Sequence, residues 1–212
     1  MDSPADAPPL SRRERRKIET RGKLLAAARS LLARQGADAM RINEITEEAD
    51  VGFGSFYNYF ASKDEIVEAV AEAVAAELGE AIAEATTDLP DAAEVLAVAH
   101  RTIISRAADD PTVGWLLVRL ELSHDLVSMA LGPFALRDLQ RGIDEGRFTV
   151  HDLGATLIAL GGGLLGVVRA VLQGRAGPEA ATEHAIVVLQ LLGLSLDDAV
   201  EVARRPLPPV RH

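Results

Sequence analysis

The chain has 212 residues, of which 48% are hydrophobic and 25% are charged, a composition typical of a folded globular protein. Aromatic residues make up only 4%, which favours helices over sheets, and the absence of cysteine excludes disulfides, thiol catalysis and cysteine-ligated metals. The net charge of −10 is unevenly divided, because residues 1–63 carry +2 and residues 64–212 carry −12. The basic N-terminal part therefore keeps nucleic acid open as a partner.

The N-terminal segment is polar, and residues 1–10 contain three prolines. We expect a flexible tail and not a secretion signal, in a cytoplasmic protein. A basic run follows it, composed of Arg12, Arg13, Arg15, Arg16 and Lys17. Such a run is usually a solvated surface, but beside a DNA-reading motif it favours phosphate contact.

Helical periodicity then dominates. Ser11 and Glu14 form a capping-box pattern, so a first helix begins there or near Thr20 and ends at Gly36. Short helices fit 42–49 and 54–60, and a second capping box at 62–65 opens a helix that ends near residue 84. Further helices are predicted at 92–108, 112–122, 126–145, 153–173, 178–194 and 196–204. No segment alternates with period two for long enough to predict a strand, so the fold class is all-α.

Residues 41–60, RINEITEEADVGFGSFYNYF, have the layout of a helix-turn-helix, a supporting helix, a tight turn and a recognition helix. The residues that can pack on a shared core are Ile45, Ala49, Val51, Phe56 and Phe60. The outward face then holds Phe53, Ser55, Tyr57, Asn58 and Tyr59. Hydroxyls can bond phosphates, asparagine can pair with adenine, and an exposed aromatic ring can contact a thymine methyl group. This face predicts DNA contact.

The segment around this motif resembles the TetR family of bacterial regulators, over about residues 20–70. The most specific part is Tyr57-x-Tyr59-Phe60-x-Ser62-Lys63. The other matching positions are Thr20-Arg21, Leu24, Ala27-Ala28, Gly36, Ile45, Ala49, Val51 and Gly54. The resemblance implies a three-helix DNA-binding domain with a fourth connecting helix, followed by a variable domain that dimerises and binds an effector.

The resemblance also implies roles for single residues. Phe53, Gly54 and Ser55 would open the recognition helix. Tyr57 and Tyr59 would contact phosphates or bases, and Lys63 would hold a phosphate at the start of the fourth helix. We also expect Asn58 to contact DNA.

The sequence departs from the family pattern in two places. Met40-Arg41 stands where the family usually has two hydroxyl residues, so the second helix lacks its hydroxyl N-cap. Arg41 could grip a phosphate directly, and Asn43 could cap the helix one turn in. Asp50 replaces a common glycine at the turn.

The segment 153–168 has no charge, but it is shorter than the ~20 residues of a membrane span, and Asp152 and Arg169 bound it closely. Its Gly161-x-Gly163-x-x-Gly166 string lies inside a helical stretch, where a dinucleotide fingerprint does not work. A strip of small residues would instead allow close helix approach, at Ala155, Ala159, Gly162, Gly163, Gly166 and Ala170. The resemblance implies a four-helix dimer interface from 153–173 and 178–194.

Residues 92–175 are rich in Leu, Val and Ala, so the helical body can hold an apolar cavity. We predict that Trp115 lines it, with plain core packing as the alternative. Residues of the same region could supply contacts to an effector, namely Arg119, Glu121, His124, Met129, Phe134 and Arg137. Glu121-x-x-His124 has di-iron ligand spacing, but no second copy exists, and we expect no metal and no cofactor.

These features divide the chain into a flexible tail (1–10), a helix-turn-helix DNA-binding domain (11–63), a helical effector-binding and dimerisation domain (64–204) and a Pro-rich tail (205–212). The leading function is a homodimeric repressor that a small hydrophobic or amphipathic effector releases from a near-palindromic operator. An activator of the same architecture is equally compatible with the sequence. An all-α enzyme and a helical scaffold that no longer binds DNA are the alternatives from other classes.

Overall fold

The computed structural model describes residues 11–124 and 126–208, without the side chains of residues 121–130. Within these ranges it contains ten helices and no strand, which confirms the predicted all-α class. The helices are α1 (Arg12–Ala39), α2 (Ile42–Glu48), α3 (Phe53–Phe56), α4 (Lys63–Thr86), α5 (Ala92–Asp109), α6 (Pro111–His124), α7 (Leu126–Asp144), α8 (Leu153–Leu172), α9 (Ala180–Leu191) and α10 (Leu196–Ala203). The predicted tail at 1–10 lies outside the described residues.

Side-chain caps fix where the long N-terminal helices begin. At α1, the Glu14 N–H donates to Ser11 Oγ at 3.2 Å and the Ser11 N–H donates to a Glu14 carboxylate oxygen at 2.8 Å. At α4, the Glu65 N–H donates to Ser62 Oγ at 3.1 Å. Each cap satisfies an N–H group that the helix itself cannot pair.

Two elements differ from their predicted lengths. Helix α1 continues to Ala39 past Gly36, whose φ of 81° and ψ of 171° kink the chain and end the regular part of the helix. Helix α3 has only four residues, because a turn takes over at residues 57–59, inside the range predicted as helical.

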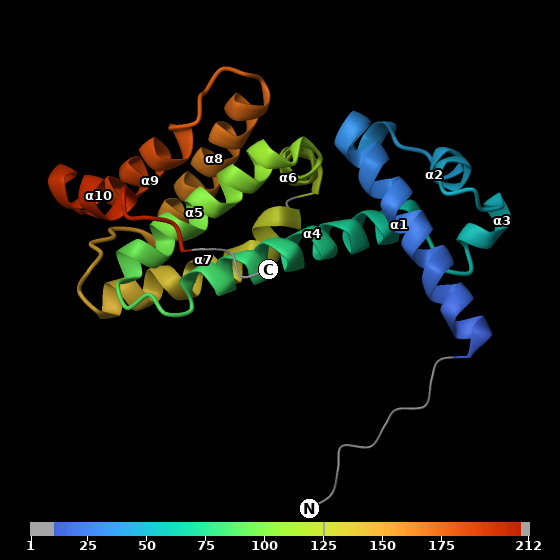
Figure 1. The fold of residues 1–212 in the computed structure, drawn as a ribbon, viewed down its shortest axis with the longest axis horizontal. Coiled ribbons are helices and arrows are strands. Elements are labelled where there is room, and N and C mark those ends of the chain that lie inside the picture. Colours follow the sequence, from blue (N-terminus) through green and yellow to red (C-terminus); the bar gives the residue numbers. More distant parts are fainter. Residues whose placement is uncertain (1–10, 125, 209–212) are drawn as a thin grey trace, which may run out of the picture.

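Helices α1–α3 form a small group at one end of the molecule, and α4 runs from this group along the larger body (Figure 1). The first hydrophobic core combines residues of α1–α4 with residues of α5 and α6, namely Ile103, Val113, Leu116, Leu117 and Leu120. Packing is therefore continuous across the predicted boundary at residue 63, and the division into domains remains a proposal.

A second core lies farther along the body, where α5 and α9 pack against α10 and the start of α8. Arg147 bridges this region by pairing with Asp91 at 3.0 Å and with Asp198 at 2.6 Å. Arg205 pairs with Glu94 at 2.6 Å, so the segment predicted as a tail from 205 begins as part of the packed body. Residues 209–212 lie outside the described residues.

Candidate functional site

The turn between α2 and α3 places the predicted recognition segment against the first core. Ile45 and Phe56 are fully buried, and Ala49 and Phe60 are nearly so, which agrees with their predicted inward facing. Asp50 has a φ of 53°, the only positive φ of a non-glycine residue in the described chain. It therefore adopts the left-handed conformation that explains why glycine is common at this turn.

The outward side of this segment is aromatic. Phe53 is 53% exposed and Tyr57 is 52% exposed, and their rings meet edge to face with centroids 5.9 Å apart. Asn58 and Gly54 are also exposed, whereas Ser55 is half-buried. Two adjacent, half-exposed aromatic rings at a helix-turn-helix are suited to contact with bases or phosphates.

Besides Ser55, two other residues that we expect to contact DNA are half-buried, Tyr59 and Lys63. Tyr59 is half-buried and packs against the first core. Lys63 is half-buried, and its Nζ donates a hydrogen bond to the carbonyl oxygen of Ala37 at 3.0 Å. In the DNA-free chain, the end of α1 therefore holds the ammonium group that we expect to contact a phosphate.

The N-terminus of α2 is capped by a carboxylate in place of the missing hydroxyl. The Arg41 N–H donates to Glu44 Oε2 at 2.9 Å, and the Gln35 amide donates to the same oxygen at 3.1 Å. The side chains of Arg41 and Asn43 are exposed and so accessible to a partner. Glu44 thus supplies the cap that we considered for Asn43.

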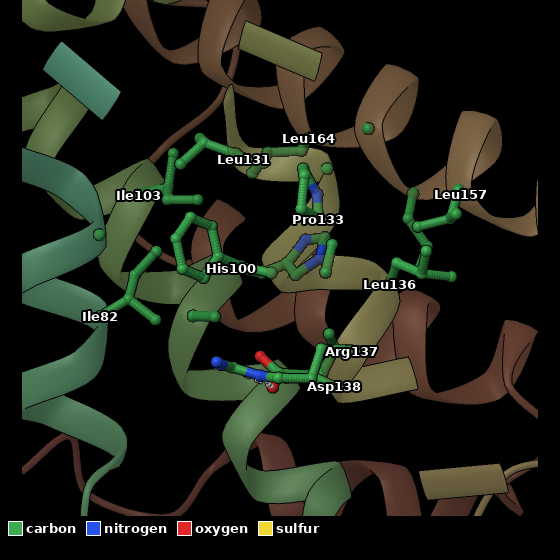
Figure 2. Close-up of a pocket in the computed structure, with 18 of the residues that line it drawn as sticks. Ile82, His100, Ile103, Leu131, Pro133, Leu136, Arg137, Asp138, Leu157 and Leu164 are labelled. Carbon is green, nitrogen blue, oxygen red and sulfur yellow. Dashed lines mark hydrogen bonds and ion pairs between the residues drawn. The ribbon is translucent and has the colours of Figure 1, made fainter. Parts of the chain in front are cut away.

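A cavity of about 650 Å³ lies in the body between α4, α5, α7 and α8 (Figure 2). Its wall is mostly apolar, with Ile82, Ile103, Leu131, Leu157 and Leu164 among the lining residues. The charged lining residues are Arg137 and Asp138, which form an ion pair at 3.1 Å. Such a volume and lining suit a small, mainly hydrophobic ligand.

The cavity corrects the predicted ligand-contacting set. Trp115 and Arg119 are not among its lining residues; Trp115 packs against the first core, and the Arg119 guanidinium lies 5.3 Å from its ring centroid. Helix α6, which carries both, packs mainly on α1. Phe134 and Arg137 do line the cavity. The side chains of Glu121, His124 and Met129 lie outside the described residues.

Sequence reasoning missed a buried histidine pair at the cavity wall. His100 Nδ1 and His184 Nε2 lie 3.1 Å apart, and both residues are buried. Burial, reinforced by the nearby His184, lowers the pKa of His100 from 6.5 to about 3, and burial also lowers the pKa of His184. Both imidazoles are therefore neutral at pH 7. The available signal was a histidine at an apolar helical position in each of two distant helices.

Helices α8 and α9 present an unusually exposed apolar face. Ile158 is 78% exposed, Val187 is 61% exposed, and Leu191 is also exposed. By length and composition, helix α8 is apolar enough to cross a membrane. Only 11% of its most apolar window is buried within the chain, so most of this apolar helix is left uncovered. An exposed apolar surface of this kind is typical of a site that packs against a partner.

The predicted small-residue strip lies along this part of the molecule. Five of its members are exposed and one, Ala170, is half-buried; the exposed ones are Ala155, Ala159, Gly162, Gly163 and Gly166. A Cβ atom on Gly162 or Gly166 would meet nothing within 4 Å. On Gly163 it would lie 3.2 Å from His184 Cε1, so Gly163 packs on α9 of its own chain.

The sequence matches two described families of regulator domains. Residues 24–70 match "Bacterial regulatory proteins, tetR family", and residues 91–205 match "Tetracyclin repressor-like, C-terminal domain". The second match alone covers more than half of the chain. Together they coincide with the helix-turn-helix region and with the body that contains the cavity.

Known proteins give the same result. RolR, solved in complex with resorcinol, has 33% sequence identity to this chain, and the two structures superpose with a TM-score of 0.74. The match covers 93% of this chain and 100% of RolR. The HTH-type transcriptional regulator CymR of Pseudomonas putida is 30% identical over 139 residues, which span 65% of this chain and 64% of CymR. FadR of Bacillus subtilis, solved with stearoyl-CoA, shares the fold at 21% identity with a TM-score of 0.67, over 81% of this chain and 96% of FadR. The chain therefore belongs to the TetR family of bacterial regulatory proteins.

Proposed function

We propose that this chain is a homodimeric, cytoplasmic repressor that binds a near-palindromic operator and is released by a small hydrophobic or amphipathic effector. The observation that carries the DNA-binding part is the pair of half-exposed rings, Phe53 and Tyr57, on the outer side of a helix-turn-helix. Leaving two large aromatic side chains in water is unfavourable unless a partner covers them. Exposed Arg41, Asn43 and Asn58 around them supply donors for phosphates and base edges.

Binding to DNA upstream of the protein's own gene tests this proposal. We expect fluorescence anisotropy to show preference for this duplex over a scrambled one of equal length, with affinity that falls steeply as salt rises. Tyr57→Ala should weaken binding to the upstream duplex by up to about tenfold and so reduce the preference. Equal and salt-insensitive affinity for both duplexes would contradict DNA-binding function.

The effector part of the proposal rests on the cavity between α4, α5, α7 and α8. Helix α4 joins the cavity wall, through Ile82 and Thr86, to the helix-turn-helix region that follows α1. A ligand that fills the cavity better in one orientation of α4 shifts the population toward that orientation. The likeness to RolR, solved with resorcinol, supports a small aromatic ligand.

Release of operator DNA tests the effector part. Resorcinol and a set of other small aromatic compounds should be titrated into the protein–DNA complex, and at least one should lower operator affinity. Cavity-filling Ala83→Trp, on α4, should abolish that response while preserving DNA binding. Release that persists unchanged in Ala83→Trp would place the effector elsewhere.

The exposed apolar face of α8 and α9 supports the homodimer. Ile158, Val187 and Leu191 are exposed in the single chain, and the glycines of α8 offer space for close approach of another helix. A second copy of the same face is self-complementary under two-fold symmetry. A two-fold dimer also matches the symmetry of a near-palindromic operator.

A further inference from the structure

His100 presents to the cavity a ring nitrogen that no described residue hydrogen-bonds. His100 lines the cavity, and Figure 2 shows its side chain directed into it from α5. Its Nδ1 is occupied by His184 at 3.1 Å. Its other ring nitrogen, Nε2, makes no hydrogen bond to any described residue.

Nε2 is nevertheless accessible. Among the described residues, no side-chain nitrogen or oxygen is both sealed from water and without a partner. A partnerless Nε2 must therefore reach open space, and the space that His100 adjoins is the cavity. A polar atom at the wall of an apolar cavity favours a ligand that supplies the missing hydrogen bond.

We propose that His100 Nε2 is the hydrogen-bonding anchor for a neutral hydroxyl group on the effector, and that His184 is a positioning residue that fixes the His100 ring and its tautomer. The proposal rests on the effector-binding function above and names the chemistry that the cavity selects. A neutral imidazole has one donor and one acceptor nitrogen, and the paired nitrogen of His184 decides which is which. A hydroxyl group both donates and accepts, so it complements Nε2 in either tautomer.

The charges at the cavity disfavour the competing ligand classes. A carboxylate needs an unpaired cation, but the Arg137 guanidinium is already paired with Asp138 at 3.1 Å. His100 does not supply the charge, because burial keeps its pKa far below 7. An ammonium group needs an unpaired anion, but the Asp138 carboxylate is paired with Arg137. An uncharged hydroxyl on an apolar frame brings no charge into the apolar cavity.

The experiment uses four probes of similar shape: 4-propylphenol, 4-propyltoluene, 4-propylbenzoate and 4-propylbenzylamine. Binding to the DNA-free protein is measured by calorimetry at pH 7. We expect the phenol to bind about three- to tenfold more tightly than the toluene, the range of one neutral hydrogen bond, and both charged probes to bind more weakly still. In His100→Phe the phenol and the toluene should bind equally, and His100→Gln should restore part of the preference.

A second measurement follows the His100 ring directly. The ¹⁵N resonance of His100 Nε2 should move on addition of 4-propylphenol and stay in place with 4-propyltoluene. In His184→Gln this resonance should indicate a changed tautomer balance, which a merely space-filling His184 would not produce.

The proposal is overturned if the phenol and toluene bind alike, if a charged probe binds best, if His100→Phe keeps the preference, or if no probe binds at millimolar concentration. A His184→Gln variant with an unchanged His100 resonance removes the positioning role. Because the measurements contain no DNA, these failures are separate from a failure to bind the operator.

Discussion

The Nζ atom of Lys63 donates a hydrogen bond to the carbonyl oxygen of Ala37 at 3.0 Å, which joins the first residue of α4 to the end of α1. The last carbonyls of a helix lack partners within the helix, and a cation there is favourable. We expect Lys63→Met to lower the free energy of unfolding by about 1–2 kcal/mol and to weaken binding to all DNA sequences. Denaturant unfolding and anisotropy measure the two effects.

Lys23→Met is the matched control for stability. Its ammonium group pairs with Glu19 at 3.1 Å, but both side chains are more than half exposed. Such a pair contributes less than about 1 kcal/mol. Equal stability of Lys63→Met and wild type would mean that the bond to Ala37 does not anchor α4.

Tyr57→Ala separates DNA contact from folding. Tyr57 is half exposed, and its ring meets Phe53 and Phe56 edge to face. The substitution should cost about 1 kcal/mol of stability, whereas operator affinity should fall up to about tenfold through the lost hydrogen bond. Phe60→Ala, which removes a ring that is 2% exposed, should instead cost about 3–5 kcal/mol. A comparable loss of stability in the two variants would show that Tyr57 is a core residue.

Asp50 carries the conformational cost of the turn. At a φ of 53° it occupies the left-handed region, which asparagine tolerates and β-branched residues do not. Asp50→Asn should leave the melting temperature nearly unchanged, and Asp50→Val should lower the unfolding free energy by about 1–2 kcal/mol. Calorimetry of both variants checks the prediction, and a Val variant as stable as wild type would disprove it.

The buried histidine pair makes stability depend on pH in mildly acidic solution. The folded-state pKa of His100 is lowered to about 3 by burial, with the His184 charge adding to it, so between about pH 6.5 and 3 the unfolded chain binds the proton first. Its contribution to stability is complete above about pH 6.5 and is lost as pH falls, by up to about 1.4 kcal/mol per pH unit. Urea unfolding at a series of pH values measures this slope.

Two variants test which histidine causes the dependence of stability on pH. His100→Gln should reduce the slope between pH 6.5 and 5 and leave the part that comes from His184, and His184→Gln should do the reverse. The carboxyl groups of Asp91 and Asp198 act in a different range. Burial alone would raise the pKa of Asp91, but the hydrogen bonds from Arg147 and from the Ala93 N–H outweigh burial, so the pKa of Asp91 is lowered. The hydrogen bond from Arg147 also lowers the pKa of Asp198. Their contribution is lost only below about pH 4.

Val187→Glu tests the homodimer. Val187 lies on the exposed face of α9 and is 61% exposed in the single chain, so the variant should fold normally. Burying two symmetry-related carboxylates should shift the protein to monomers in light scattering. Gly166→Trp should act in the same direction by overpacking. Ile18→Glu, at a similarly exposed residue of α1, should leave the mass unchanged; if Val187→Glu does too, this face does not form the dimer.

Local features of the structure followed from the sequence. The capping residues Ser11 and Ser62, the helical spacing and the inward facing of Ile45 and Phe56 depend only on neighbours in the chain. These are signals that periodicity and cap chemistry encode directly. The extent of α3 was overestimated, because a turn at 57–59 competes successfully with the helix.

The cavity and its polar group could not be predicted in the same way. His100 and His184 are 84 residues apart and meet only because α5 packs on α9. Trp115 was assigned to the cavity by its position among apolar residues, but it packs against the first core, on a helix whose main neighbour is α1. Which side of a mostly apolar helix faces a void depends on the packing of several helices at once.

Helix α4 connects the helix-turn-helix region to the cavity wall over a long distance. Its 24 residues span about 36 Å, with Lys63 at one end and the cavity residues Ile82 and Thr86 near the other. A rotation of only about 5° around the cavity end displaces the Lys63 end by about 3 Å, as long as a hydrogen bond to a phosphate. The proposed effector therefore need not reshape the fold to change what the far end can reach, because a small rotation at the cavity end moves the Lys63 end by the length of a hydrogen bond.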